Sequence, residues 1–234
     1  MRALLYTTGS PYARGVRIIL HELGLDYEAQ EEITTPTAAQ RADATPTLQV
    51  PTLWDGDHTL WESGLIAEYL LSSYTQRPDN APPLAARSWR ASHEWHDKLV
   101  FATIQTLGGA ATTISQMTWS GVSHADNAHL TRCAERLPHI LAWLSDRLPS
   151  AGAGFIPGVV SVQDIFLACH LRFIENRPLG LDPELGGYPK IAALLARLDA
   201  RESFKDTPIL WWEPGVIGYA DDGRTPIYED SRNA

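Results

Sequence analysis

Two short stretches of the chain place polar side chains directly ahead of expected helices. Ser10 precedes Pro11 and an apolar helical pattern, and Glu62-Ser63 precedes another. A serine at such a position caps the helix when its oxygen accepts a backbone N–H. Its hydroxyl can also donate a hydrogen bond to an anion, which the positive end of the helix attracts. Ser10 is therefore the first candidate for chemistry.

Histidine and cysteine patterns do not point to a metal site, and no metal is expected. His93 and His96 lack the His-Glu-x-x-His spacing of zinc proteases, and no distant third ligand is evident. Cys133 and Cys169 have no Cys-x-x-Cys spacing, so we expect buried, reduced thiols.

The charge balance restricts the partners of the protein. The 234 residues include 19 Lys and Arg against 28 Asp and Glu, giving a net charge of −9. Such a chain repels phosphate backbones and anionic lipid, so neither nucleic acid nor membrane is an expected partner. No apolar run approaches the ~20 residues of a membrane span, and no signal peptide is evident. We expect a cytoplasmic protein.

The first part of the chain alternates between strand and helix patterns. A short apolar strand over residues 3–6, a helical pattern over 14–23 and a strand over 27–33 predict a βαβ unit with a parallel strand pair. After a polar segment over residues 34–47, two apolar runs flank an Asp-Gly turn and predict a hairpin. A helix follows from Glu62, so the predicted order is βαβ and then ββα.

The composition changes after this α/β part. Proline-rich residues predict a linker at 77–84, between an α/β domain of residues 1–76 and an all-helical domain of residues 85–234. Helical patterns are expected over residues 84–118, 126–148, 161–176 and 188–201, the third opened by a Ser161–Asp164 capping box. The apolar residues of the C-terminal tail, 208–234, indicate an ordered but irregular segment.

Several stretches, in order along the chain, resemble cytosolic glutathione transferases. Ser10-Pro11-Tyr12-Ala13 is similar to the Cys-Pro-Tyr-Cys motif of glutaredoxins with both cysteines replaced, and residues 10–25 resemble the start of serine-type transferases (bacterial, tau or zeta-like). Three further segments resemble motifs of the family: TPTLQVPTL (45–53), ESGLIAEYL (62–70) and the segment from Tyr188-Pro189 to Phe204. The class within the family stays open.

The resemblance implies a thioredoxin-like N-terminal domain that binds glutathione and an all-α C-terminal domain that presents an apolar electrophile. It also implies a homodimer and a catalytic role for Ser10. Only the thiolate of glutathione attacks electrophiles, and a free thiol titrates near ~8.5. A hydrogen bond to the charged sulfur contributes ~1.5–3 kcal/mol, which lowers the pKa of the thiol by ~1–2 units.

The resemblance assigns the other glutathione contacts to two segments. Val50, before a cis Pro51, pairs through its backbone with the cysteinyl unit, and Glu62-Ser63 hold the γ-glutamyl end. Read alone, Pro51 is an edge-strand or turn proline and Glu62-Ser63 are capping residues.

Gln49 departs from the family pattern, because a basic residue often stands just before the Val-Pro pair. Gln49 can still offer a neutral hydrogen bond to the glycyl carboxylate of glutathione. Arg14 or Arg41 could supply the missing charge.

Other interpretations remain open at this point. Ser10 could be an N-cap only, and Tyr6 and Tyr12 are rival hydroxyl donors because other transferase classes use a tyrosine near this strand end. Aromatic residues expected in the electrophile pocket or in the core are Trp89, Trp95, Phe101 and Trp119. The chain could also be a non-catalytic binding module, or a glutathione-dependent disulfide-bond reductase.

Overall fold

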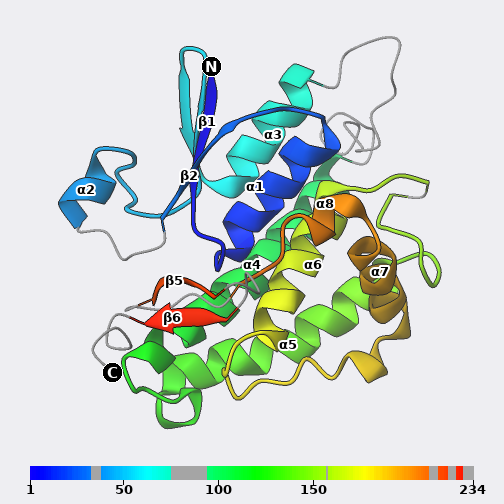
Figure 1. Ribbon diagram of the computed structural model, residues 1–234. Helices are drawn as coiled ribbons and strands as arrows, with labels where there is room; N and C mark the ends of the chain where they lie inside the picture. Colours follow the sequence, from blue (N-terminus) through cyan, green and yellow to red (C-terminus); the bar gives the residue numbers. More distant parts are fainter. Residues whose placement is uncertain (33–37, 75–93, 157, 211–215, 221–224, 229–234) are drawn as a thin grey trace.

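The computed structural model describes residues 1–32, 38–74, 94–156, 158–210, 216–220 and 225–228. Figure 1 shows a small sheet with its helices packed against a larger group of helices, the N-terminal and C-terminal parts of the chain. The predicted linker at residues 77–84 lies outside the described residues.

The N-terminal part has the predicted βαβ-ββα order. Its elements are β1 (Arg2–Tyr6), α1 (Pro11–Glu22), β2 (Glu28–Glu31), α2 (Ala38–Ala42), β3 (Thr52–Asp55), β4 (His58–Trp61) and α3 (Ser63–Tyr74). The sheet order is β2-β1-β3-β4, with β1 parallel to β2 and antiparallel to β3. The parallel pair and the β3–β4 hairpin are therefore confirmed.

Two local details differ from the sequence prediction. Helix α1 starts at Pro11, earlier than the apolar pattern alone indicates, because proline fits the first helical position and Ser10 caps it. Helix α2 lies in the polar connecting segment, for which no helix was predicted. None of its residues is buried, so no apolar periodicity reveals it.

The C-terminal part is helical as expected. It contains α4 (Glu94–Trp119), α5 (Ala128–Arg147), α6 (Val162–Glu175), α7 (Pro189–Asp199) and α8 (Glu202–Lys205), with short 3-10 helices at His124–Asp126 and Leu185–Gly187. The Ser161–Asp164 capping box at the start of α6 is confirmed. Cys133 and Cys169 are buried and unpaired thiols, also as predicted.

The tail corrects one expectation. Residues Val216–Tyr219 (β5) and Pro226–Tyr228 (β6) pair as an antiparallel two-stranded sheet, so this part of the tail is regular rather than irregular. The strands hold only four and three residues, too few for alternation to stand out in the sequence.

Close packing fixes α1 on the helical domain. Gly15 faces Phe166 of α6 so closely that a Cβ at Gly15 would lie 2.6 Å from the ring. At the other end of α1, the Glu22 carboxylate accepts hydrogen bonds from Arg201 Nε (2.7 Å) and from the Ser203 hydroxyl (2.5 Å). Helix α1 is therefore held in a fixed position relative to α6 and α8.

Candidate functional site

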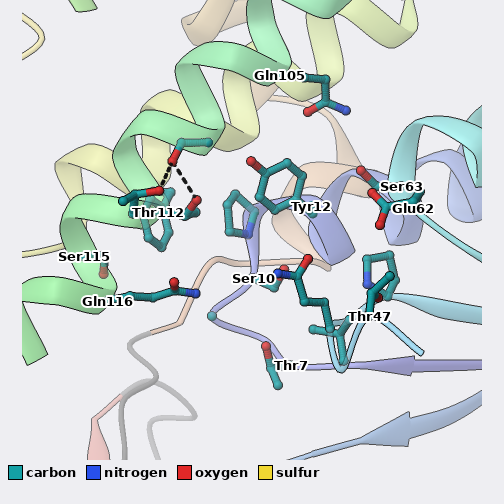
Figure 2. Close-up of a pocket in the computed structure, with 18 of the residues that line it drawn as sticks. Thr7, Ser10, Tyr12, Thr47, Glu62, Ser63, Gln105, Thr112, Ser115 and Gln116 are labelled. Atoms are coloured by element: carbon teal, nitrogen blue, oxygen red, sulfur yellow. Dashed lines mark hydrogen bonds between the residues drawn. The ribbon is translucent and has the colours of Figure 1, made fainter. Parts of the chain in front are cut away.

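A cavity of about 790 Å³ lies between the N-terminal part and α4. It brings together six of the residues that the sequence predicts for the glutathione site: Ser10, Gln49, Val50, Pro51, Glu62 and Ser63. Figure 2 shows Ser10, Thr47, Glu62 and Ser63 on one side, with Thr112, Ser115 and Gln116 of α4 across from them. Segments far apart in sequence thus share one cavity.

Ser10 caps α1 and also faces the cavity. Its Oγ accepts a hydrogen bond from the Ala13 N–H at 3.2 Å, with the extended backbone of an N-cap residue. This bond uses a lone pair and leaves the hydroxyl proton available to a ligand. Capping and donation to an anion are therefore compatible at this residue.

Val50 and Pro51 form the floor of the cavity ahead of β3. The Val50–Pro51 peptide bond is cis, as the resemblance implied. Neither the backbone N–H nor the backbone C=O of Val50 forms a hydrogen bond with the described residues, because the ladder pairing of β3 begins at Thr52. An extended peptide in the cavity can pair with them as an added strand does.

Glu62 and Ser63 form the start of α3 at the cavity wall. The Glu62 carbonyl accepts the Ile66 N–H at 3.0 Å, so the helix begins here and its first N–H groups are open to an anion. Glu62 has φ of 66°, and Leu48, also on the cavity wall, has φ of 57°. Such left-handed backbone costs ~1–3 kcal/mol per residue and tends to occur at ligand sites.

The two candidate cations have different positions. Arg41 lies on the cavity wall, where Nε donates to Glu32 Oε1 (2.7 Å), Nη1 donates to the Leu48 carbonyl (3.0 Å) and Nη2 pairs with Glu32 Oε2. Arg14 does not reach the cavity. Its guanidinium is buried and donates to the Thr207 carbonyl at 2.6 Å, so the expectation for Arg14 is wrong.

Tyr6 and Tyr12, the rival hydroxyl donors, are separated by the fold. Tyr6 is a core residue outside the cavity, and its hydroxyl lies 3.5 Å from Glu31 Oε2. Tyr12 lines the cavity, and its hydroxyl approaches α4 at Gly109, where a Cβ would lie 3.8 Å away. Burial raises the pKa of Tyr12, with a smaller contribution from the nearby Glu62 charge, although a Thr112 hydrogen bond opposes the rise.

Helix α4 supplies the opposite wall, and its polarity was not anticipated. Phe101 and Trp119 lie on this wall as expected, whereas Trp95 lies outside it with 81% of its surface exposed; Trp89 falls outside the described residues. Polar residues on the same wall are Gln105, Thr112, Thr113, Ser115 and Gln116. Gln105, Thr112 and Gln116 recur at helical spacing, a signal present in the sequence.

Two other properties concern the described residues alone. Within them, no group of three or more His, Cys, Asp or Glu side chains is arranged to hold a metal ion. None of the described helices combines the length and apolarity required to cross a bilayer.

Sequence comparisons identify the family. The family models described as "Glutathione S-transferase, N-terminal domain" and "Glutathione S-transferase, C-terminal domain" match residues 9–73 and 127–197, which together are more than half of the chain. The Glutathione S-transferase-like protein OpS6 of Beauveria bassiana is 28% identical over 201 residues, covering 81% of this chain and 86% of that protein. The similar protein gedE of Aspergillus terreus is 33% identical over 90 residues, and the matched region covers only 40% of its length.

Solved structures share the fold. A glutathione S-transferase of Methylobacterium radiotolerans, in complex with glutathione sulfonate, aligns with a TM-score of 0.70 at 23% identity, covering 88% of this chain and 93% of that one. A glutathione S-transferase of Methylobacillus flagellatus with glutathione bound gives 0.68 at 23% identity, covering 88% and 98%. With the thioredoxin-like sheet, the helical domain and both family matches in agreement, the chain belongs to the glutathione S-transferase family.

Proposed function

We propose that this protein is a glutathione transferase in which Ser10 stabilises the thiolate of bound glutathione for attack on an electrophile held against α4. The observation that carries the proposal is the single cavity shared by the Ser10 hydroxyl, the unpaired Val50 backbone and the start of α3. These groups match the three chemical parts of glutathione that need recognition: a thiolate, a peptide backbone and a zwitterionic γ-glutamyl end.

Ser10 acts on the sulfur through its hydroxyl proton and the positive end of α1. A charge-assisted hydrogen bond of ~1.5–3 kcal/mol lowers the pKa of the bound thiol by ~1–2 units from ~8.5. The thiol is then largely ionised near neutral pH. Ser10 itself forms no covalent bond, because the nucleophile belongs to glutathione.

The ends of glutathione take different partners. Glu62 receives the γ-glutamyl ammonium, while Ser63 and the first N–H groups of α3 receive its carboxylate. Arg41 and Gln49 are placed for the glycyl carboxylate, since both line the cavity beside Val50. Because Arg41 already pairs with Glu32, it contributes less to binding of the glycyl carboxylate than an unpaired cation would.

A homodimer is part of this proposal. Large apolar side chains are exposed on α3 (Leu65, 52%) and on α4 (Trp95, 81%; Leu99, 54%). The two helices adjoin, since a Cβ at Gly64 of α3 would lie 3.0 Å from Phe101 of α4. Exposed apolar residues on adjoining helices are typical of a protein interface.

Ultraviolet absorbance of the thiolate in the glutathione complex tests the role of Ser10. In Ser10→Ala we expect the apparent pKa of the bound thiol to rise by ~1–2 units, and kcat/KM for chlorodinitrobenzene below pH 7 to fall ~10–100-fold. Ser123→Ala is the matched control, because Ser123 also caps a helical turn through a 3.2 Å bond but lies outside the cavity.

Three results would contradict the proposal. Full activity and an unchanged thiol pKa in Ser10→Ala would remove Ser10 from the mechanism. A wild-type protein that binds glutathione calorimetrically but shows no thiolate absorbance and no turnover would be a binding module. Turnover confined to mixed disulfides would instead indicate a reductase.

A further inference from the structure

A second cavity, of about 570 Å³, lies outside the proposed glutathione site. Its walls come from α1, α6, α7, α8 and residues 208–210, which follow α8. None of the residues that line it also lines the larger cavity. The proposed thiolate chemistry therefore does not account for the groups that this second cavity brings together.

Arg14 gives this cavity a buried cation. The residue is only 4% exposed, and its Nε and Nη2 donate to the backbone carbonyls of Thr207 (2.6 Å) and Phe204 (3.3 Å). Among the described residues, no carboxylate forms an ion pair with this guanidinium, and Nη1 has no hydrogen-bond partner. A buried charge without an opposite charge is unfavourable. The remaining N–H groups suit a carboxylate, which accepts two hydrogen bonds side by side.

The same cavity also carries an excess of negative charge. Glu175 is the last residue of α6, Asp199 is the last residue of α7, and both line the cavity. Among the described residues, both carboxylates pair with one guanidinium, that of Arg172, through Nη1 and Nη2 respectively. Two carboxylates on one guanidinium leave one negative charge, and the C-terminal end of a helix adds partial negative charge. This part of the wall therefore favours a cationic group.

The rest of the wall offers one further acceptor and an apolar surface. The Nδ2 of Asn176 donates to the Ile209 carbonyl at 3.0 Å, which leaves Oδ1 to accept from a ligand. The apolar side chains on the wall are Phe204, Pro208, Ile209 and Leu210. A bare inorganic ion would leave this apolar surface in contact with water, so the ligand that fits carries an apolar group as well as charges.

We propose that this cavity binds a free α-amino acid with a large apolar side chain. Arg14 binds the α-carboxylate, Glu175 and Asp199 bind the ammonium group, and the apolar wall receives the side chain. Lys205, the other charged residue on the wall, already pairs with Glu202 at 2.8 Å. The wall therefore offers one uncompensated charge of each sign, which a zwitterion satisfies and a dicarboxylate or phosphate does not. This inference goes beyond the proposed function and uses none of its residues.

Calorimetry with three probes that share a phenyl ring tests this site. L-Phenylalanine carries both charges, 3-phenylpropanoate lacks the ammonium group and 2-phenylethylamine lacks the carboxylate. The titrations contain saturating glutathione, so that the γ-glutamyl part of the larger cavity is already filled. We expect the Kd of each truncated probe to be ~10–100-fold higher than that of L-phenylalanine, because each lacks one set of charge-assisted hydrogen bonds.

Two substitutions locate the bound amino acid. In Asp199→Asn we expect the Kd of L-phenylalanine to rise ~3–10-fold while that of 3-phenylpropanoate does not rise. Asp206→Asn is the matched control, because the exposed Asp206 carboxylate pairs with His21 and does not line the cavity. Ile209→Trp fills the cavity and should abolish binding of L-phenylalanine, whereas Glu135→Trp on the exposed face of α5 should not.

The outcomes separate this inference from the proposed function. Equal Kd values for L-phenylalanine and 3-phenylpropanoate would make the cavity a site for plain carboxylates and overturn the inference. Binding of L-phenylalanine that disappears when glutathione is added, or that persists in Ile209→Trp, would place the amino acid elsewhere and overturn it too, as would a wild type that binds no L-phenylalanine. Failure to bind glutathione would contradict the proposed function alone, because Ile209→Trp still locates the amino acid.

Discussion

The contact between Glu22 and α8 joins the two parts of the molecule through one carboxylate. Glu22 Oε1 accepts from Arg201 Nε (2.7 Å) and from the Ser203 hydroxyl (2.5 Å), and Oε2 accepts from Arg201 Nη2 (2.6 Å). The Glu22 side chain is only 6% exposed, whereas that of Arg201 is 34% exposed. Replacing Glu22 by Gln therefore leaves the shape but removes the charge from a nearly dry site.

The expected loss of stability follows from these bonds. Hydrogen bonds to a charged group contribute ~1.5–3 kcal/mol each, so three of them set an upper limit of several kcal/mol. Water reaches Arg201 and offsets part of the loss, because partly exposed ion pairs contribute little on their own. Glutamine also keeps one acceptor oxygen. We therefore expect Glu22→Gln to lower the free energy of unfolding by ~2–3 kcal/mol, or ~5–10 °C in Tm for a chain of this size.

Urea unfolding at neutral pH, followed by circular dichroism, measures this change. Glu202→Gln is the matched control. It removes a carboxylate from the exposed pair with Lys205, whose side chains are 73% and 53% exposed, so we expect a change below ~0.5 kcal/mol. The difference between the two variants isolates the buried contact from a general effect of charge.

The pH dependence of this stability has a definite sign. Burial alone would raise the pKa of Glu22, but the hydrogen bonds from Arg201 and Ser203 outweigh it, and the pKa lies below the ordinary value of 4.5. A depressed carboxyl pKa contributes stability above the pKa of the unfolded chain and loses it as the pH falls through the folded value. The gap between wild type and Glu22→Gln should thus be full above about pH 5 and shrink in more acidic solution. A gap that stays constant into acid, or a change no larger than in Glu202→Gln, would refute the reasoning.

Two further predictions concern glutathione and assembly. In Arg41→Gln we expect the Kd for glutathione to rise ~3–10-fold with no change in the Kd for γ-glutamylcysteine, which lacks the glycyl carboxylate; equal calorimetric changes for both ligands would exclude this placement. For assembly, we expect Leu99→Lys to shift the chain from dimer to monomer in sedimentation at micromolar concentration, whereas the exposed Glu135→Lys on α5 should not; a wild-type monomer would contradict the proposed interface.

Local patterns were sufficient to predict the sheet and the main helices. Apolar periodicity located α1, the Asp-Gly turn located the β3–β4 hairpin, and Ser161 with Asp164 located the start of α6. Helix α2 was not predicted because a short helix with no buried residue has no apolar face to mark it in the sequence. The β5–β6 pair was not predicted because its strands hold only four and three residues, too few for an alternating pattern to stand out.

The candidate residues show a similar division. Ser10 became a candidate from its position directly ahead of a helix, whereas Val50 and Glu62 were predicted from the family resemblance of their segments. The direction of the Arg14 side chain was not predicted, because its hydrogen-bond partners are the backbone carbonyls of Phe204 and Thr207, far along the chain. The polar wall of α4 was missed because only the packing of α6 against both α1 and α4 determines which face of α4 borders the cavity.

The start of α1 brings two hydroxyl-bearing side chains, Ser10 and Tyr12, to the wall of one cavity. Successive helical residues are rotated by about 100° about the axis, so side chains two positions apart point in roughly opposite directions. Ser10, the N-cap, shares the cavity wall with Val50, and Figure 2 shows the Tyr12 ring extending toward α4. Glutaredoxins resemble this segment but place a cysteine where Ser10 stands, and a cysteine attacks its substrate directly. In the proposed function, a serine in that position keeps the nucleophile on glutathione, because the helix start then supplies hydrogen-bond donors and no attacking thiol.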